Sequence, residues 1–207
     1  MTALLHPTYF PNVAHMAIML QSDVINFEYC DTYGKQTYRN RCCIMRANGL
    51  LQLNIPVIHS QKNRQLYSNV EVSHAEKWQL THLKSLETAY RKSPFFEFYI
   101  DDLKPLFTKK VSNLYEFNID CLKVIFECLQ LPLNFSLTQF FDQNTRQYLD
   151  ARTLVFCKKE VNQSFENYIQ VFSDKHEFIG NLSILDLLFN EGPNTVNYLK
   201  SQNVNLQ

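Results

Sequence analysis

Hydrophobic and polar positions over the first thirty residues predict a strand, a helix and a second strand. Residues 2–6 (TALLH) form a short apolar run. Residues 12–21 (NVAHMAIMLQ) follow as a helix, for which Asn12 is available as the N-cap. Residues 23–29 (DVINFEY) alternate between two unlike faces, as a strand does. A strand, a helix and a strand in this order are typical of a βαβ unit in a parallel sheet.

Three further strands are expected between residues 41 and 73. The segments 41–45 (RCCIM) and 50–58 (LLQLNIPVI) flank Asn48-Gly49, a dipeptide that strongly favours a tight hairpin. Residues 66–73 (LYSNVEVS) carry alternating valines and form the third candidate strand.

The rest of the chain has mainly helical patterns. A capping-box pattern at Ser73 predicts a helix to about residue 91, which Ser93-Pro94 ends. Two more helices are expected over about 95–106 and 113–129. A second capping-box pattern at 183–186 opens a helix that Gly192-Pro193 ends. Residues 168–172 (YIQVF) predict a short strand, whereas residues 132–165 give no clear pattern.

These elements predict an α/β fold, with a Rossmann-like, mostly parallel sheet in the N-terminal part and a helical C-terminal half. We expect a single domain over residues 1–207, because a chain of this length can bury about 70% of its unfolded surface around one core. The composition, 45% hydrophobic and only 19% charged, excludes a disordered chain.

The charge balance limits the partners. Twenty basic and twenty acidic side chains give a formal net charge of zero, whereas a duplex-binding domain usually carries a basic excess. We therefore expect no nucleic-acid partner, and any site for an anion must be a local cluster of cations.

The sequence also indicates a cytoplasmic location. No apolar run approaches the 18 or so residues that would span a bilayer, and the N-terminal segment lacks the features of a secretory signal. The six cysteines include no C-x-x-C pair, so we interpret them as reduced packing residues and expect no metal site.

Residues 34–43 (GKQTYRNRCC) contain a local concentration of cations. If residues 35–41 are extended, Lys35, Arg39 and Arg41 lie on one face together with Thr37. Arginine suits bidentate recognition of a phosphate or carboxylate, so this face is a candidate anion site. The alternative is a charged edge strand that discourages aggregation.

Two histidines lie near the first predicted turn. His6 ends the first strand, and His15 lies in the first turn of the helix that follows. Ligands of open parallel sheets bind beyond the carboxyl ends of the strands, so both rings are candidates to face a crevice there. A histidine can donate to phosphate or act as an acid or base near neutral pH. For each ring, a purely structural role is the alternative.

Glu28 and Asp31 follow the second predicted strand. An acid at the carboxyl end of a strand can bind a substrate hydroxyl or act as a base. The alternative is a salt bridge to Lys35 or Arg39.

Several elements, taken in order, resemble one known family. They are His6 with Tyr9-Phe10-Pro11, the strand ending in Glu28, Lys35-x-x-x-Arg39-Asn40-Arg41, Asn48-Gly49 with Leu53-x-Ile55-Pro56-Val57, Trp78 with Ala89-Tyr90 and Ser93-Pro94-Phe95-Phe96-Glu97, and residues 182–193 (LSILDLLFNEGP). Their order and approximate spacing resemble the WbqC-like family over nearly the whole chain. The most specific are residues 38–41 (YRNR) and the segment that begins LSILDLLFN.

The resemblance implies a bacterial cytoplasmic protein, some of whose relatives are associated with surface-polysaccharide gene sets. With the residues above it leads to the hypothesis of a small-molecule transferase-like enzyme. The substrate would be an anionic metabolite that is nucleotide-linked, phosphorylated or acylated. The alternative is a non-catalytic ligand-binding or scaffold protein that retains the pocket. No cofactor and no oligomeric state follow from the sequence.

This hypothesis assigns a role to each candidate residue. Lys35, Arg39 and Arg41 would hold the anion, Asn40 and Tyr9 would orient the substrate, and His6 or His15 would transfer a proton, with Glu28 as partner or alternative base.

Overall fold

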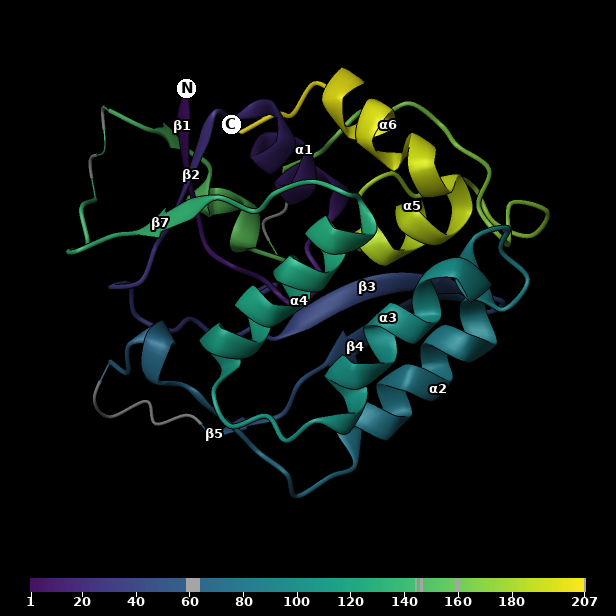
Figure 1. Ribbon diagram of the computed structural model, residues 1–207, viewed down its shortest axis with the longest axis horizontal. Helices are drawn as coiled ribbons and strands as arrows, with labels where there is room; N and C mark the ends of the chain where they lie inside the picture. Colours follow the sequence, from purple (N-terminus) through teal and green to yellow (C-terminus); the bar gives the residue numbers. More distant parts are fainter. Residues whose placement is uncertain (59–63, 144, 146, 159–160, 207) are drawn as a thin grey trace.

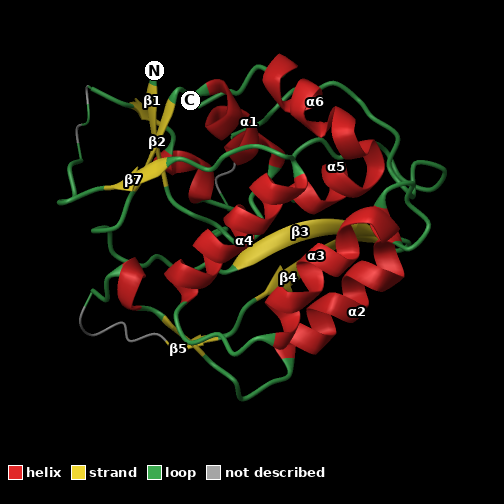
Figure 2. Cartoon of the chain, viewed as in Figure 1, coloured by secondary structure: helices red, strands yellow, loops and turns green. Residues whose placement is uncertain are grey.

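The computed structural model describes residues 1–58, 64–143, 145, 147–158 and 161–206 (Figure 1). Within these residues the chain forms eight strands and six α-helices, which Figure 2 distinguishes by colour. The strands are β1 (Thr2–Leu5), β2 (Val24–Phe27), β3 (Arg41–Arg46), β4 (Gly49–Asn54), β5 (Val57–Ile58), β6 (Glu71–Val72), β7 (Phe135–Leu137) and β8 (Leu149–Asp150). The helices are α1 (Val13–Gln21), α2 (Trp78–Tyr90), α3 (Phe96–Thr108), α4 (Leu114–Cys128), α5 (Ile184–Glu191) and α6 (Thr195–Ser201).

Four of these strands form a parallel sheet in the order β7-β2-β1-β8. The predicted βαβ unit is its centre, because β1 and β2 pair directly, with Thr2 opposite Val24, and α1 connects them. Asn12 caps α1 as predicted, and its side chain accepts a hydrogen bond from the backbone N–H of His15. The predicted α/β class, with a parallel sheet near the N-terminus and mostly helical residues after it, is confirmed.

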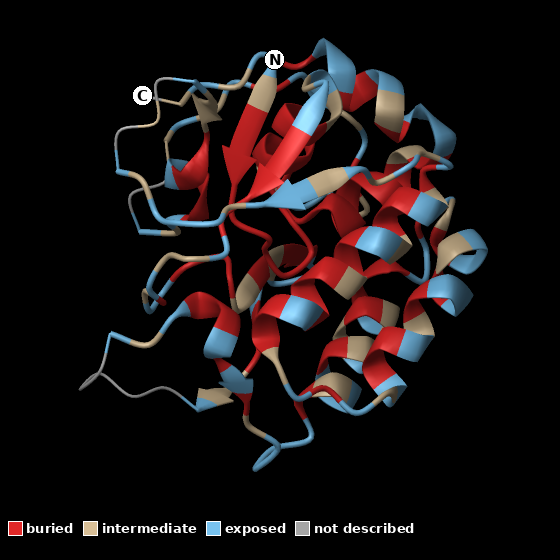
Figure 3. Cartoon of the chain, turned by 60° about the vertical axis from the view of Figure 1, so that its left-hand side comes forward, coloured by how far each residue is buried: buried red, intermediate tan, exposed pale blue. Residues whose placement is uncertain are grey.

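The two outer strands of the sheet come from residues 135–150, within the stretch that shows no clear hydrophobic pattern. β7 has three residues and β8 has two, which is too short for an alternation of period two to be visible. In Figure 3, β1 and β2 are largely buried, whereas β7 lies at a more exposed edge of the sheet.

The predicted hairpin at Asn48-Gly49 is confirmed, because β3 and β4 pair antiparallel and Gly49 takes a positive φ of 99°. The next two strand predictions are wrong in part. The segment 50–58 is not one strand, since the run Ile55-Pro56 separates β4 from the short β5. Residues 66–73 form a 3₁₀ turn (Tyr67–Asn69) before β6.

The predictions for the helices α3 and α4 are confirmed. α3 and α4 begin and end within two residues of the predicted bounds, and the Asn113 side chain caps α4 by accepting from the N–H of Glu116. The capping box at Ser73 is wrong, because α2 begins only at Trp78. The strand over residues 168–172 is also wrong: this segment has no regular structure.

The helices and the β3–β4 hairpin complete the core. α2 and α3 lie at the far end from the parallel sheet, with the hairpin between them and the sheet (Figures 1 and 2). α1 packs against α5 and α6. The six cysteines are free thiols. None of the described helices combines the length and apolarity needed to cross a bilayer.

Two glycines with positive φ offer a matched test of this packing. A Cβ at Gly192, which ends α5 with φ 52°, would lie 2.5 Å from the ring of Phe95, whereas a Cβ at Gly49 would find its nearest neighbour, in His176, at 4.0 Å. We expect Gly192→Ala to lower the free energy of unfolding by about 2–5 kcal/mol, from strain plus overpacking. Gly49→Ala should cost only the backbone strain, about 1–2 kcal/mol. Urea denaturation of both variants measures the difference, and equal losses would contradict the close approach at Phe95.

Candidate functional site

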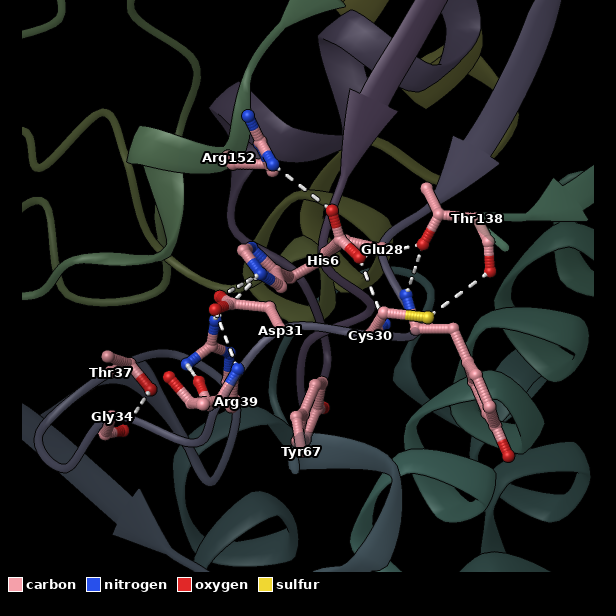
Figure 4. A network of polar contacts seen from close by, with 12 residues as sticks. His6, Glu28, Cys30, Asp31, Gly34, Thr37, Arg39, Tyr67, Thr138 and Arg152 are labelled. Atoms are coloured by element: carbon pink, nitrogen blue, oxygen red, sulfur yellow. Dashed lines mark hydrogen bonds and ion pairs between the residues drawn. The ribbon is translucent and has the colours of Figure 1, made fainter. Parts of the chain in front are cut away.

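Polar side chains follow the carboxyl ends of all four parallel strands. His6 comes directly after β1, Glu28 after β2 and Thr138 after β7, while Arg152 lies two residues beyond β8. Carboxyl ends of parallel strands share one edge of a sheet, and this edge is where open α/β sheets bind ligands. We call these residues, together with Asp31, Arg39 and Asp150, the strand-end cluster; Figure 4 labels all of them except Asp150.

His6, Asp31 and Arg39 meet at one carboxylate oxygen. Oδ2 of Asp31 lies 2.8 Å from Nε2 of His6 and accepts from Nη2 of Arg39 at 2.6 Å. Nη2 of Arg39 also lies 2.7 Å from Nε2 of His6. Nδ1 of His6 is buried and has no hydrogen-bond partner in the described part of the chain. A guanidinium nitrogen can only donate, so Nε2 of His6 cannot be hydrogen-bonded to both Arg39 and Asp31 in one neutral tautomer. We assign the proton to Nε2, where Asp31 accepts it, and a lone pair to Nδ1, so that Nη2 of Arg39 is a close neighbour of the ring and not its hydrogen-bond donor.

Arg39 is fixed from the remaining sides. Its guanidinium lies over the ring of Tyr67, 5.0 Å from the centroid, and Nη1 donates to the carbonyl of Thr32 at 3.2 Å. Asn118 on α4 donates to both the carbonyl of Arg39 and the hydroxyl of Tyr67. The Arg39 side chain is only 4% exposed, so these contacts must stabilise its positive charge in place of water.

Glu28, Arg152 and Asp150 form the other half of the cluster. Arg152 donates to both carboxylate oxygens of Asp150, at 2.9 and 2.6 Å, and to Oε2 of Glu28 at 3.1 Å. Oε1 of Glu28 accepts from the Thr138 hydroxyl at 2.7 Å and from the N–H of Cys30 at 2.9 Å. The contacts to Thr138 and Arg152 join β2 to β7 and β8.

Burial and neighbouring charges set the protonation states of His6 and Asp31 at neutral pH. Burial, reinforced by the charge of Arg39, lowers the pKa of His6 from 6.5 to about 4, so the ring is neutral at pH 7. Burial would raise the pKa of Asp31, but the hydrogen bond from His6 and the charge of Arg39 outweigh it and hold the pKa at about 2. The cluster therefore combines a neutral imidazole with an ionised carboxylate.

The charges in the cluster nearly cancel. Three carboxylates (Glu28, Asp31 and Asp150) face two guanidiniums (Arg39 and Arg152), which leaves one negative charge when His6 is neutral. Both guanidiniums are engaged by internal carboxylates. Arg39 pairs with Asp31. For this acid, a salt bridge to Lys35 or Arg39 was the alternative to a role in binding or catalysis.

The extended arrangement predicted for residues 35–41 is wrong. Strand β3 begins only at Arg41, and the preceding residues form turns in which Gln36 takes a positive φ of 60°. Arg39 consequently points inward while Lys35 is exposed. Arg41 is half-buried, and its nearest polar contact is Gln52 at 3.5 Å. Asn40 donates to the carbonyl of Ile55 and thereby holds the backbone.

His15 and Tyr9 lie in the core. The Asn12 amide oxygen lies 2.9 Å from Nδ1 of His15. Burial, with a contribution from His6, lowers the pKa of His15 to about 3. The Tyr9 hydroxyl is hydrogen-bonded to Nδ1 of His82 at 2.9 Å. Neither side chain contacts the strand-end cluster through a hydrogen bond in the described residues.

Five residues that belong to the strand-end cluster or contact it were not predicted from the sequence. Thr138, Asp150 and Arg152 lie in the stretch without a clear pattern, and Tyr67 lies in a segment that we predicted as a strand. Asn118 carried a usable signal, because it is a fully buried amide within the otherwise apolar stripe of α4.

A small pocket opens beside Glu28. Its volume is about 140 Å³, and it is lined by Asn26, Glu28, Thr138 and the loop that follows β7. Phe140 on this loop is 70% exposed at the rim. By contrast, His6 and Arg39 are each only 3% exposed. Of the strand-end cluster, Glu28 and Thr138 line this pocket.

Comparison with known proteins identifies one family. A family model described as the WbqC-like protein family matches residues 6–170 and residues 140–198. The first match includes the whole strand-end cluster, and the second includes α5. Comparisons with curated proteins and with solved structures gave no significant match.

The low pKa values of three buried histidines predict how the free energy of unfolding depends on pH. The pKa values of His6, His15 and His82 are lowered to about 4, 3 and 4, mainly by burial, so below about pH 6.5 the unfolded chain binds protons that the folded chain does not. The free energy of unfolding should therefore fall steadily between about pH 6.5 and 4. Burial raises the pKa of Asp186, which opposes this loss near the acid end. Asp31 adds to it only below about pH 4.

Urea denaturation between pH 7 and 4.5 measures this dependence. His15→Gln removes one of the three histidines without touching the strand-end cluster, and it should make the slope shallower by about a third. A stability that does not change over this range would contradict the neutral, buried state of the histidines.

Proposed function

The chain belongs to the WbqC-like protein family, and on that basis we propose that it is a small-molecule transferase-like enzyme whose chemistry takes place at the strand-end cluster. The observation that carries the proposal is the convergence of a histidine, its carboxylate partner and two guanidiniums at the carboxyl ends of four parallel strands. This is the position at which open parallel sheets bind their ligands.

In this proposal His6 is the general base. Asp31 accepts the Nε2 proton and so fixes the ring with its lone pair at Nδ1. Nδ1 is buried, so it would take a proton from a hydroxyl or amine of the acceptor once the side chains that cover His6 move aside. The imidazolium that results would face the carboxylate of Asp31 through Nε2, which stabilises its positive charge, while the guanidinium of Arg39 beside it acts in the opposite direction. Asp31 is then a positioning residue, and Glu28 is held by Arg152 and Thr138 as a structural anchor.

The anionic part of the substrate would bind to Arg41. Arg41 makes no ion pair with any described residue, whereas Arg39 is paired with Asp31. Arg41 follows Arg39 by two residues, at the first position of β3, and has an uncompensated charge. Lys35, which is exposed, would assist from the surface.

A second candidate function is ligand binding without turnover. The observation that favours it is the low pKa of His6, about 4, because a base works best when its pKa lies near the operating pH. In the enzyme, a substrate anion beside the ring would raise that pKa toward neutrality.

The two arginines provide a matched test of the anion site. A thermal-shift screen of nucleotides, nucleotide sugars and acylated carriers selects a ligand, which at 100 times its Kd should stabilise the fold by about 2.7 kcal/mol. Arg41→Gln should weaken that ligand at least about tenfold by calorimetry, since it removes the unpaired cation, and should leave stability within about 0.5 kcal/mol. Arg39→Gln should instead cost about 3–5 kcal/mol of stability, because it leaves Asp31 without its cation. Unchanged affinity in Arg41→Gln would exclude this residue as the anion site.

His6→Asn separates catalysis from binding. With the ligand from the screen as donor and hydroxyl or amine compounds as acceptors, the variant should keep the affinity of the wild type and lose about 10²–10⁴-fold in kcat. His82→Asn serves as a control, since this histidine is also buried but lies against Tyr9 in the core. Turnover that survives in His6→Asn would refute the general-base role. A wild-type protein that binds the ligand but turns over no acceptor would establish the second candidate instead.

A further inference from the structure

A second hollow lies at the end of α2, away from the strand-end cluster. Its walls are the last two turns of α2 with residues 91–92, the β3–β4 turn at Ala47, and the residues Val171, Phe172 and Lys175. In Figure 1 this is the right-hand side, where the loop after residue 165 approaches the end of α2. The volume of about 600 Å³ is typical of sites for small molecules. We call this hollow the α2 groove.

One buried carboxylate ties the walls of the α2 groove together. Asp186 on α5 accepts from the Tyr90 hydroxyl at 2.7 Å, from the Tyr168 hydroxyl at 2.6 Å and from Nε2 of Gln170 at 2.9 Å. Tyr90 belongs to the α2 wall, and its oxygen also accepts from the N–H of Met45 in β3. Gln170 directly precedes the third wall. All three walls are therefore fixed to one another before any ligand arrives.

The α2 groove is strongly positive within a chain of zero net charge. Four exposed cations line it (Lys84, Arg91, Lys92 and Lys175), against the single lining acid Glu87, which gives a charge of +3 among the lining residues. Asp174, next to Lys175, lies outside the lining. Among the described residues none of these four forms an ion pair. By contrast, Lys104, Lys109 and Lys123 on the neighbouring helices each pair with an aspartate.

The helix dipole does not account for these cations. Cations after the last turn of a helix interact favourably with its carbonyl end, which is a sufficient reason for Arg91 and Lys92. Lys84 lies in the middle of α2, however, and Lys175 comes from a segment 80 residues further along the chain. Two distant parts of the sequence therefore bring exposed cations to the same hollow, where one polyvalent anion could contact both.

The base of the α2 groove is apolar. Val171 and Phe172 are half-buried, and Ala47 and Ala89 line the groove beside them. Phe172 provides an aromatic surface next to the cations. A ligand that fits these two features carries several negative charges at one end and a flat apolar group at the other.

We propose that the α2 groove binds a phosphorylated small molecule with an aromatic part, as in a nucleoside triphosphate, whose phosphates lie among Lys84, Arg91, Lys92 and Lys175 and whose ring lies on Phe172. This site is separate from the strand-end cluster and does not depend on the function proposed for it. Asp186, in the segment that begins LSILDLLFN, positions its walls.

Calorimetric titration with ATP and with inorganic tripolyphosphate tests the proposal. ATP should bind more tightly than tripolyphosphate, because only ATP carries a ring for Phe172, and Phe172→Ala should remove that difference. The double variant Lys92→Glu and Lys175→Glu should weaken ATP at least about tenfold, while Glu87→Gln should strengthen it, since it removes the one acid of the groove. The affinity should also fall as salt is raised from 50 to 200 mM.

Lys110→Glu is the matched control. This lysine is exposed and lies outside the α2 groove, so the same change of charge there should alter the affinity less than about twofold. Absence of binding by both compounds at millimolar concentration would overturn the proposal. So would an equal loss in Lys110→Glu and in the double variant. Equal affinity for ATP and tripolyphosphate in the wild type would overturn the role of Phe172.

Discussion

The buried guanidinium of Arg39 is the constraint on which the arrangement of the strand-end cluster depends. A cation that is only 4% exposed needs a paired carboxylate, and Asp31 provides it from the loop after β2. Tyr67 and Asn118 surround the same residue from the 3₁₀ turn and from α4. Three parts of the chain that are distant in sequence are therefore held to the end of the parallel sheet by one charge. The turn conformation of residues 31–40 follows from the need to bring Arg39 inward.

The pairing of guanidiniums with internal carboxylates also determines the electrostatic environment of His6. Because both guanidiniums are matched by internal carboxylates, the cluster is electrostatically almost complete without a ligand. Electrostatic interactions are stronger in such a water-poor environment, so small changes in charge near His6 have large effects on its pKa. The protein thus keeps a neutral imidazole beside an ionised carboxylate in a nearly closed site.

The sequence predicted the parts of the fold that depend on local pattern. The first βαβ unit, the hairpin at Gly49 and the helices α3 and α4 follow from periodicity, capping residues and turn chemistry. It placed His6 and Glu28 at the ends of the first two strands, where the structure also has them, but oriented residues 35–41 wrongly, because a buried salt bridge overrides the alternation of a strand. Arg152 escaped prediction since its partner Glu28 lies 124 residues away. The irregular path of residues 168–172 likewise depends on a distant carboxylate, Asp186.

The order of the parallel sheet has a consequence for how the chain reaches its native state. The central strands β1 and β2 come first along the chain, but their outer edges are covered by β8 and β7, and Ala3 pairs with Leu149 across most of the sequence. Such non-local pairing slows folding, since a long loop must close before the contact forms. Until residues 135–150 are available, both edges of the central pair expose unpaired backbone groups. During synthesis the edges of this N-terminal unit are therefore open to pairing with another chain.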